Sequence, residues 1–131
     1  MKSKVLIIDD ELMICKSLKA GLSDMGYIAA TAQTKKEALV QVRSFKPNLV
    51  LTDMRLGNEN GIELIEDIKK IDSDIEVIVM TAYSDIASAV LAIKKGAFDY
   101  INKPFELEEI RLVLERAYEN YKIKNKLMIL E

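Results

Sequence analysis

Histidine is missing from this sequence of 131 residues, and proline, glycine and cysteine are scarce, at two, five and one residues. Without histidine, the chain lacks the commonest general base and the commonest zinc ligand. Any chemistry must therefore run on carboxylates, hydroxyls, lysine and a hard metal ion. So few prolines and glycines also exclude a linker or a low-complexity chain.

An excess of charge of either sign is also missing. The formal net charge is −2, from 19 basic and 21 acidic residues, which gives no electrostatic footprint for nucleic acid or an anionic membrane. No apolar run approaches the length of a membrane span, and the apolar start at Val5–Ile8 is too short for a signal peptide. We therefore expect a cytoplasmic protein that binds neither nucleic acid nor membrane directly.

The lone Cys15 agrees with a reducing compartment, because it has no partner for an internal disulfide. It falls in a predicted helix, where we interpret it as a small core or boundary residue. A redox role is disfavoured, since no second cysteine could resolve an oxidised thiol.

What the sequence does contain is a regular alternation of strand-like and helix-like segments. Half of the residues are hydrophobic, which is enough for one core in a chain of this size. Alternation of this kind implies parallel strands with right-handed crossovers and helices on both faces. We predict an α/β fold: a single doubly wound, five-stranded parallel sheet of flavodoxin-like order 2-1-3-4-5, with five helices in three layers. The strands are predicted at residues 4–8, 27–32, 48–53, 75–80 and 98–101. Residues 34–37 fit a capping box that opens the second helix, and the last helix is expected to bury Leu107, Ile110, Leu114 and Ala117.

The third of these strands, Asn48–Asp53, is central to the functional interpretation. Its apolar run is typical of a strand buried on both faces, and it ends in a single aspartate. In open parallel sheets, chemistry collects at the carboxyl ends of the strands. Asp53 alone could be a metal ligand, a general base or a nucleophile there.

The other strand ends narrow these choices. The first strand ends in Asp9 and Asp10, the fourth in Thr81, and the fifth leads to Lys103. Carboxylates gathered on one rim repel one another unless a cation is present, and an all-oxygen site favours Mg²⁺. A hydroxyl and an ammonium beside such an ion suit the oxygens of a phosphoryl group. Asp53, the only acid isolated at a central strand end, is the best candidate for a nucleophile that forms an aspartyl phosphate.

Each of these residues also has an ordinary structural interpretation. The Asp9-Asp10 pair could cap the following helix, and Thr81 and Asp53 could form turns. Lys103 could be a surface lysine. The coincidence of four strand ends, each with the residue type that the chemistry needs, favours the functional interpretation.

Four ordered motifs carry a family resemblance: VLIIDDE at 5–11, LTDM at 51–54, MTA at 80–82 and KPF at 103–105. With these motifs, the sequence resembles the receiver domain of two-component response regulators from Lys4 to about Tyr118. The region 81–105 is most similar to receivers of the NtrC type, which control sigma-54-dependent transcription.

The resemblance implies a role for each acidic residue. Asp53 would be the phosphoacceptor and thus the modified residue. Asp10 would bind Mg²⁺ directly, and Asp9 would bind it mostly through water. The backbone carbonyl of Arg55 would be a further metal ligand.

The resemblance also implies which residues would bind a phosphoryl group and respond to it. Thr81 would donate a hydrogen bond to it, Lys103 would pair with it, and Tyr100 would be the switch aromatic that swings inward as Thr81 moves. Without the resemblance, Tyr100 would be interpreted as a strand residue with a solvated hydroxyl. A cis peptide bond between Lys103 and Pro104 is implied as well.

One position departs from the family pattern. Members usually carry proline four residues after the phosphoacceptor, where this chain has Gly57. Glycine widens the conformational choices of the backbone, so we expect a less pre-organised loop there.

Two further segments suggest contacts beyond this domain. We predict a receiver domain at residues 1–118, and at 119–131 a helical extension or linker to a missing output domain; a frayed tail is the alternative. The fourth helix, at 84–95, is apolar on nearly every side, which indicates a dimer or effector surface or else a deeply buried helix. The apolar residues of the extension are Tyr121, Ile123, Leu127, Met128 and Leu130, after Tyr118.

The expected function is phosphorelay signal transduction. A sensor histidine kinase would supply the phosphoryl group, and modification of Asp53 would switch the surface of the fourth helix, fifth strand and fifth helix, through which a homodimer could also form. We expect the chain to control an output domain that regulates transcription. We also expect it to catalyse only its own phosphoryl transfer and dephosphorylation. The alternatives are a Mg²⁺-dependent phosphohydrolase and a degenerate receiver that binds partners without phosphorylation.

Overall fold

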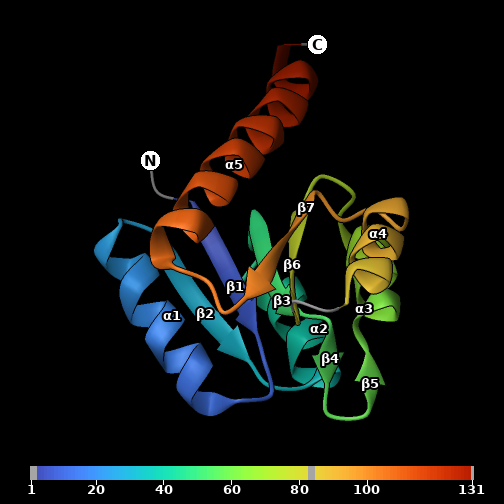
Figure 1. Ribbon diagram of the computed structural model, residues 1–131. Helices are drawn as coiled ribbons and strands as arrows, with labels where there is room; N and C mark the ends of the chain where they lie inside the picture. Colours follow the sequence, from blue (N-terminus) through green and yellow to red (C-terminus); the bar gives the residue numbers. More distant parts are fainter. Residues whose placement is uncertain (1–2, 83–84, 131) are drawn as a thin grey trace.

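A five-stranded parallel sheet forms the centre of the molecule (Figure 1). The structure, a computed structural model, describes residues 3–82 and 85–130, with residues 126–130 as backbone only. The strand order is β2-β1-β3-β6-β7, which confirms the predicted doubly wound topology. The strands are β1 (Lys4–Ile8), β2 (Ile28–Ala32), β3 (Leu49–Asp53), β6 (Glu76–Ala82) and β7 (Asp99–Lys103).

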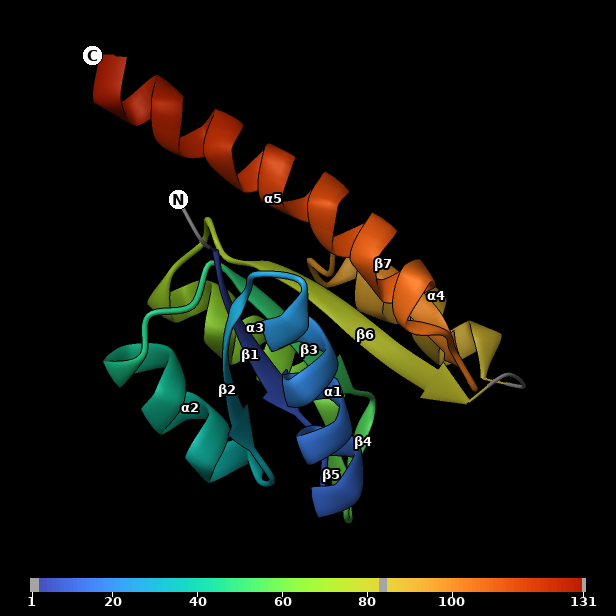
Figure 2. The ribbon, with the colours of Figure 1, turned by 90° about the vertical axis from the view of Figure 1, so that its left-hand side faces the viewer.

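Five helices cover the two faces of this sheet, as predicted. Helices α2, α3 and α4 pack on one face and α1 and α5 on the other, so that two apolar layers enclose the strands (Figure 2). Ser84 and Glu131, the predicted ends of the fourth and last helices, lie outside the described residues. The helices are α1 (Leu12–Asp24), α2 (Lys35–Ser44), α3 (Gly61–Ile71), α4 (Ile86–Lys94) and α5 (Leu107–Leu130).

Alternation along the strands decides which side chains meet each layer. In β1, Leu6 and Ile8 join the core under α2 and α3, whereas Val5 and Ile7 join the core under α1 and α5. All four are fully buried, because a parallel sheet between two helical layers leaves neither face to solvent. The same alternation continues past the strand ends and fixes the directions of the polar residues there.

Local signals in the sequence explain several helix ends. The Thr34 side chain accepts a hydrogen bond from the Glu37 N–H at 3.1 Å, which caps α2 as the predicted capping box requires. The Asn60 side chain caps α3 by accepting from the Ile62 N–H at 2.8 Å. One expectation for the core was wrong: Leu107 is 39% exposed at the start of α5 rather than buried.

A short antiparallel hairpin, which the sequence pattern did not predict, follows β3. It consists of β4 (Arg55–Leu56) and β5 (Glu59–Asn60), with Gly57 at φ 63° in the connecting turn. The Gly61 N–H then donates to the Met54 carbonyl at 2.7 Å and closes the base of the hairpin. A Cβ at residue 61 would lie 2.7 Å from that same oxygen, so only glycine fits here.

Helix α4 exposes much of its apolar surface. The exposed fractions of Ile86, Val90 and Leu91 are 60%, 47% and 43%, whereas Ala89 and Ala92 face the core. The alternative of a deeply buried fourth helix is therefore wrong. An apolar surface on this helix remains available to a partner.

Helix α5 continues beyond the sheet as a single helix to Leu130 and projects away from the body (Figures 1 and 2). The predicted division at residue 118 therefore falls inside a continuous helix. The side chains of Leu127, Met128 and Leu130, which we expected to be apolar contacts, lie outside the described part of the chain. Among the described residues, no helix is both long and apolar enough to cross a membrane.

Candidate functional site

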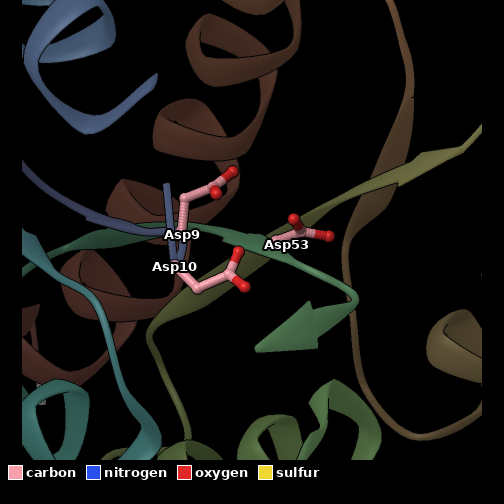
Figure 3. Close-up of side chains that lie close together, drawn as sticks. All are labelled: Asp9, Asp10 and Asp53. Atoms are coloured by element: carbon pink, nitrogen blue, oxygen red, sulfur yellow. The ribbon is translucent and has the colours of Figure 1, made fainter. Parts of the chain in front are cut away.

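Three carboxylates meet where β1 and β3 end. Each of Asp9, Asp10 and Asp53 places one oxygen within 4.8 Å of the others (Figure 3). Strands β1 and β3 are direct neighbours in the sheet, with Ile8 opposite Thr52, so the residues that follow them emerge side by side. The sequence predicted this grouping from the strand ends alone.

Asp9 is the buried member of the group, with 0% exposure. Its Oδ1 accepts the Glu11 N–H at 2.9 Å, and its Oδ2 accepts from Lys103 Nζ at 3.1 Å. Burial raises the pKa of the Asp9 carboxyl, although these two hydrogen bonds act in the opposite direction. The alternative that the Asp9-Asp10 pair caps α1 is wrong, because Glu11 occupies the N-cap position and α1 has no side-chain cap hydrogen bond there.

Cys15, in the first turn of α1, contacts the backbone of Asp9. Its Sγ donates to the Asp9 carbonyl at 3.3 Å, and the residue is 1% exposed. Burial raises the pKa of the Cys15 thiol, which disfavours the reactive thiolate. The sequence-based interpretation as a small core residue is confirmed.

Lys103, the last residue of β7, bridges two of the carboxylates. Its Nζ lies 3.0 Å from Asp53 Oδ2 and 3.1 Å from Asp9 Oδ2. Burial lowers the pKa of this ammonium, but the hydrogen bonds to Asp53 and Asp9 outweigh burial, and the net direction is upward. The alternative of an unpaired surface lysine is therefore wrong. The Lys103-Pro104 peptide bond is cis, as the resemblance implied.

Asp53 is the carboxylate at the centre of the site that solvent can still reach. Its side chain is 18% exposed at the end of β3, and it shares Lys103 with Asp9. Asp53 Oδ1 also accepts the Arg55 N–H at 3.2 Å, so the residue shapes the turn as well as the site. Coordination of a metal by the Arg55 carbonyl stays a prediction.

Asp10 points to the same space but is exposed. Its Oδ2 accepts the Gly57 N–H at 3.1 Å, a contact between residues that are 47 positions apart. Sequence analysis treated Gly57 only as a departure from the family pattern and missed this bond. The hairpin that brings the two groups together left no signal in the hydrophobic periodicity.

Thr81 occupies the neighbouring strand β6 and is 1% exposed. Its hydroxyl donates to Asn102 Oδ1 at 3.3 Å, because the register of β6 and β7 sets the two residues opposite each other. Tyr100, two residues earlier in β7, lies on the same face and packs half-buried against the core under α2 and α3. Sequence analysis missed Asn102, since the register of two strands cannot be read from either one.

This donor set fits a hard divalent cation. All the available ligand atoms are oxygens, and the sequence contains no histidine that could recruit a softer metal. One carboxylate is buried and two are more accessible, which leaves room for water ligands of the kind that Mg²⁺ retains. Lys103 offsets part of the negative charge without closing the side of the group occupied by Asp10.

The fold and the site together define a class of protein: a doubly wound α/β domain with an acidic ligand site at its switch point. Comparison with known families makes the assignment specific. Residues 5–115 match the family described as the response regulator receiver domain. The chain belongs to this family, which confirms the resemblance seen in the sequence.

Individual relatives support the same assignment. The transcriptional regulatory protein ZraR of Escherichia coli (strain K12) is 40% identical over 113 residues, which are 86% of this chain and 26% of that protein. A crystal structure of NtrX from Brucella abortus superposes with a TM-score of 0.93 at 34% identity, covering 100% of this chain and 30% of the other. The solution structure of the beryllofluoride-activated NtrC4 receiver domain dimer gives a TM-score of 0.84 at 36% identity, covering 90% and 98% of the two chains. This chain therefore spans only about a quarter of the curated relative's length, and the expected likeness to NtrC-type receivers is confirmed.

Proposed function

We propose that this receiver domain accepts a phosphoryl group on Asp53 and that the modification switches its surface. The observation that carries the proposal is the shared ammonium of Lys103, which bonds both Asp53 and the buried Asp9 beside an accessible Asp10. In that arrangement the Asp53 carboxylate is partly accessible to solvent and has a positive charge beside it, which would suit an incoming phosphoryl oxygen.

The chain's own groups supply the chemistry of transfer. A carboxylate oxygen of Asp53 attacks phosphorus in line, the phosphorus–nitrogen bond of a phosphohistidine breaks, and the imidazole leaves with the electron pair. The phosphohistidine belongs to a separate protein, a sensor histidine kinase, because this sequence has no histidine of its own. Lys103 Nζ then pairs with a phosphoryl oxygen in place of Asp53 Oδ2.

Asp9, Asp10, Asp53 and the backbone carbonyl of Arg55 would hold Mg²⁺. When bound, the ion supplies positive charge that offsets the repulsion between the carboxylates and the incoming phosphoryl oxygens. The domain acts as an acceptor that catalyses its own phosphorylation and dephosphorylation, rather than as an enzyme with an external substrate.

The switch follows from the position of Thr81. Its hydroxyl leaves Asn102 and donates to the new phosphoryl group, which opens space on the face of β6 and β7 where Tyr100 packs. Tyr100 then moves inward, and the surface of α4, β7 and α5 changes with it. This is a shift between two packings of one fold.

The exposed apolar side chains of α4 are the best candidates for the surface that receives this change. Ile86 and Val90 are 60% and 47% exposed, and a second copy of the domain would cover them. An activated NtrC4 receiver forms a dimer. We propose that phosphorylation favours a homodimer through α4, β7 and α5 or through the projecting part of α5, and that this assembly controls an output domain for transcription.

Intact-mass spectrometry after incubation with a small acyl phosphate and MgCl₂ tests the proposal. The wild-type protein should gain one phosphoryl group, and Asp53→Asn, which keeps the shape but not the nucleophile, should gain none. Asp24→Asn, an exposed aspartate at the end of α1, is the matched control and should be modified like the wild type. A gain that persists in Asp53→Asn, or repeated turnover of phosphate monoesters, would contradict the proposal.

A further inference from the structure

Gly57 stands where most receivers carry proline, and the structure gives that substitution a consequence. The residue lies in the two-residue turn of the β4–β5 hairpin, between Leu56 and its partner Glu59. Its φ of 63° is the left-handed conformation that a hairpin turn of this length requires at its first central position. Proline, whose φ is fixed near −65°, cannot adopt it.

The turn directs the Gly57 N–H at the acidic site. It donates to Asp10 Oδ2 at 3.1 Å, and within residues 3–82 and 85–130 no other donor bonds this carboxylate. Asp9 and Asp53, in contrast, share Lys103. The exposed member of the acidic group is therefore held by the hairpin alone.

The base of the hairpin keeps this contact in place. The Gly61 N–H bonds the Met54 carbonyl at 2.7 Å, and the Met54 N–H bonds the Met80 carbonyl of β6 at 3.0 Å. Both ends of the loop are thus tied to the sheet that carries the acidic residues. Because these two hydrogen bonds fix the base of the hairpin, the folded domain holds the Gly57 N–H next to Asp10.

From these contacts we propose that the Gly57 backbone N–H is a positioning group for Asp10 and sets this chain's affinity for Mg²⁺. An ionised carboxylate has about four acceptor positions, so one N–H fixes its orientation and leaves the others for a cation. Hydrogen bonds from outside the ligand shell orient metal ligands in this way. The inference rests on the proposed role of Asp10 as a metal ligand. It adds a supporting group, the Gly57 N–H, that proline at the same position would lack.

The test compares two substitutions of Gly57 by NMR titration of ¹⁵N-labelled protein with MgCl₂. Gly57→Pro removes the N–H, and its Mg²⁺ affinity should fall about tenfold, the usual effect of losing such a support. Gly57→Asn keeps the N–H. The positive φ strains any side chain, but asparagine adopts it more readily than most residues, and a Cβ there meets nothing within 4 Å. Its affinity should stay within about twofold of the wild type, because the orienting bond is retained.

The Gly57 amide gives a second readout that needs neither metal nor a proline variant. In metal-free protein, Asp10→Ala should move the Gly57 amide resonance and speed its hydrogen exchange, while the Gly61 amide, bonded to Met54, should keep its exchange rate. An unchanged Gly57 amide in Asp10→Ala, or wild-type Mg²⁺ affinity in a folded Gly57→Pro protein, would overturn the inference. A wild-type protein that binds no Mg²⁺ would contradict the proposed function, whereas the metal-free amide result decides the Gly57–Asp10 contact separately.

Discussion

Asp9 carries a carboxylate with no exposed surface, and its partners are one backbone N–H and one shared ammonium. Taking a charge out of water is costly unless its partners compensate fully. The raised pKa of Asp9, caused by burial, indicates that they do not. This cost in stability agrees with the proposed role of Asp9 in metal binding, since residues of functional sites often reduce stability.

We predict that Asp9→Asn stabilises the metal-free protein by about 1 kcal/mol, the scale of a typical point mutation but with the opposite sign. Because the folded-state pKa of Asp9 lies above the unfolded value of 3.8, its contribution to stability is complete below that pH. It is lost as the pH rises through the folded pKa. The advantage of the asparagine variant should therefore grow from acidic to neutral pH, as measured by denaturant unfolding without metal.

Addition of MgCl₂ provides the control for this prediction. A ligand present at 100 times its Kd stabilises the folded state by about 2.7 kcal/mol, and the wild type should gain such a term. Asp9→Asn should gain much less. A variant that is less stable than the wild type without metal and at neutral pH would contradict this account of Asp9.

Asn102 differs from Asp9, because it holds the Thr81 hydroxyl, the group that we propose binds the phosphoryl group. The Thr81–Asn102 bond of 3.3 Å stabilises the unphosphorylated arrangement. Asn102→Ala removes the acceptor, and a net hydrogen bond of about 1 kcal/mol corresponds to about a fivefold shift in population. The Thr81 and Tyr100 resonances of the unphosphorylated variant should move toward those of the phosphorylated wild type.

A double-mutant cycle separates this effect from a general loss of stability. If Asn102 acts through the Thr81 hydroxyl, then Asn102→Ala should have no further effect on a Thr81→Val background. Equal shifts with and without the hydroxyl would show that Asn102 acts by another route.

At the scale of the elements, hydrophobic runs and capping residues predicted most of the secondary structure. The strand at Leu49–Asp53 and the cap at Thr34 lie where the pattern placed them, since both signals are local. The β4–β5 hairpin was missed because its strands have two residues each and little apolar character. The predicted burial of Leu107 was wrong, because helical spacing gives the direction of a side chain but not how much of the protein covers it.

The projecting helix α5 depends on a buried acid that the sequence did not single out. Glu76, at the start of β6, is 3% exposed and accepts hydrogen bonds from Asn120 and from Lys124 Nζ, the latter at 3.3 Å. Lys69 of α3 approaches the same carboxylate at 3.5 Å. Residues of β6, α3 and α5 therefore meet at the Glu76 side chain, at the opposite end of the strands from the acidic site.

We predict that Glu76→Ala loosens α5 after residue 117. Loss of the carboxylate leaves partly buried donors without an acceptor, which costs about 1–3 kcal/mol. Amide hydrogen exchange in residues 118–125 should speed up by about tenfold or more, since every 1.4 kcal/mol is a factor of ten.

Glu119→Ala is the matched control for this prediction. Glu119 pairs with Lys122 on the same helix, but its side chain is 68% exposed, and exposed pairs contribute little. Its exchange should match the wild type. Unchanged protection in Glu76→Ala would show that α5 is held without this carboxylate.

At the scale of the whole molecule, the parallel sheet gathers residues from four strands at one rim. The sequence predicted the approach of Asp9, Asp10 and Asp53, because the ends of adjacent parallel strands coincide. It could not predict which donors complete the site. Asn102 depends on the register of β6 and β7, and Gly57 depends on a hairpin closed by backbone bonds.

The acidic site and the contacts that hold α5 lie at opposite ends of the strands. The acidic site lies at the carboxyl ends of the strands, while Glu76, which bonds α5, lies at the amino-terminal end of β6. Helix α4 contacts β7, and Tyr100 of β7 lies opposite Val79, two residues before Thr81 in β6. The proposed change at Asp53 would reach α4 through β6 and β7, which pair directly with each other.

The central claim is that Asp53 alone accepts the phosphoryl group. Peptide mass mapping of the protein, treated with a small acyl phosphate and MgCl₂ and then reduced with borohydride, tests it most directly, because an acyl phosphate is reduced where a phosphate ester of threonine, serine or tyrosine is not. We predict reduction at residue 53 only, and none when the metal is chelated. A stable phosphate on Thr81, or reduction at Asp9 or Asp10 with Asp53 intact, would contradict the account.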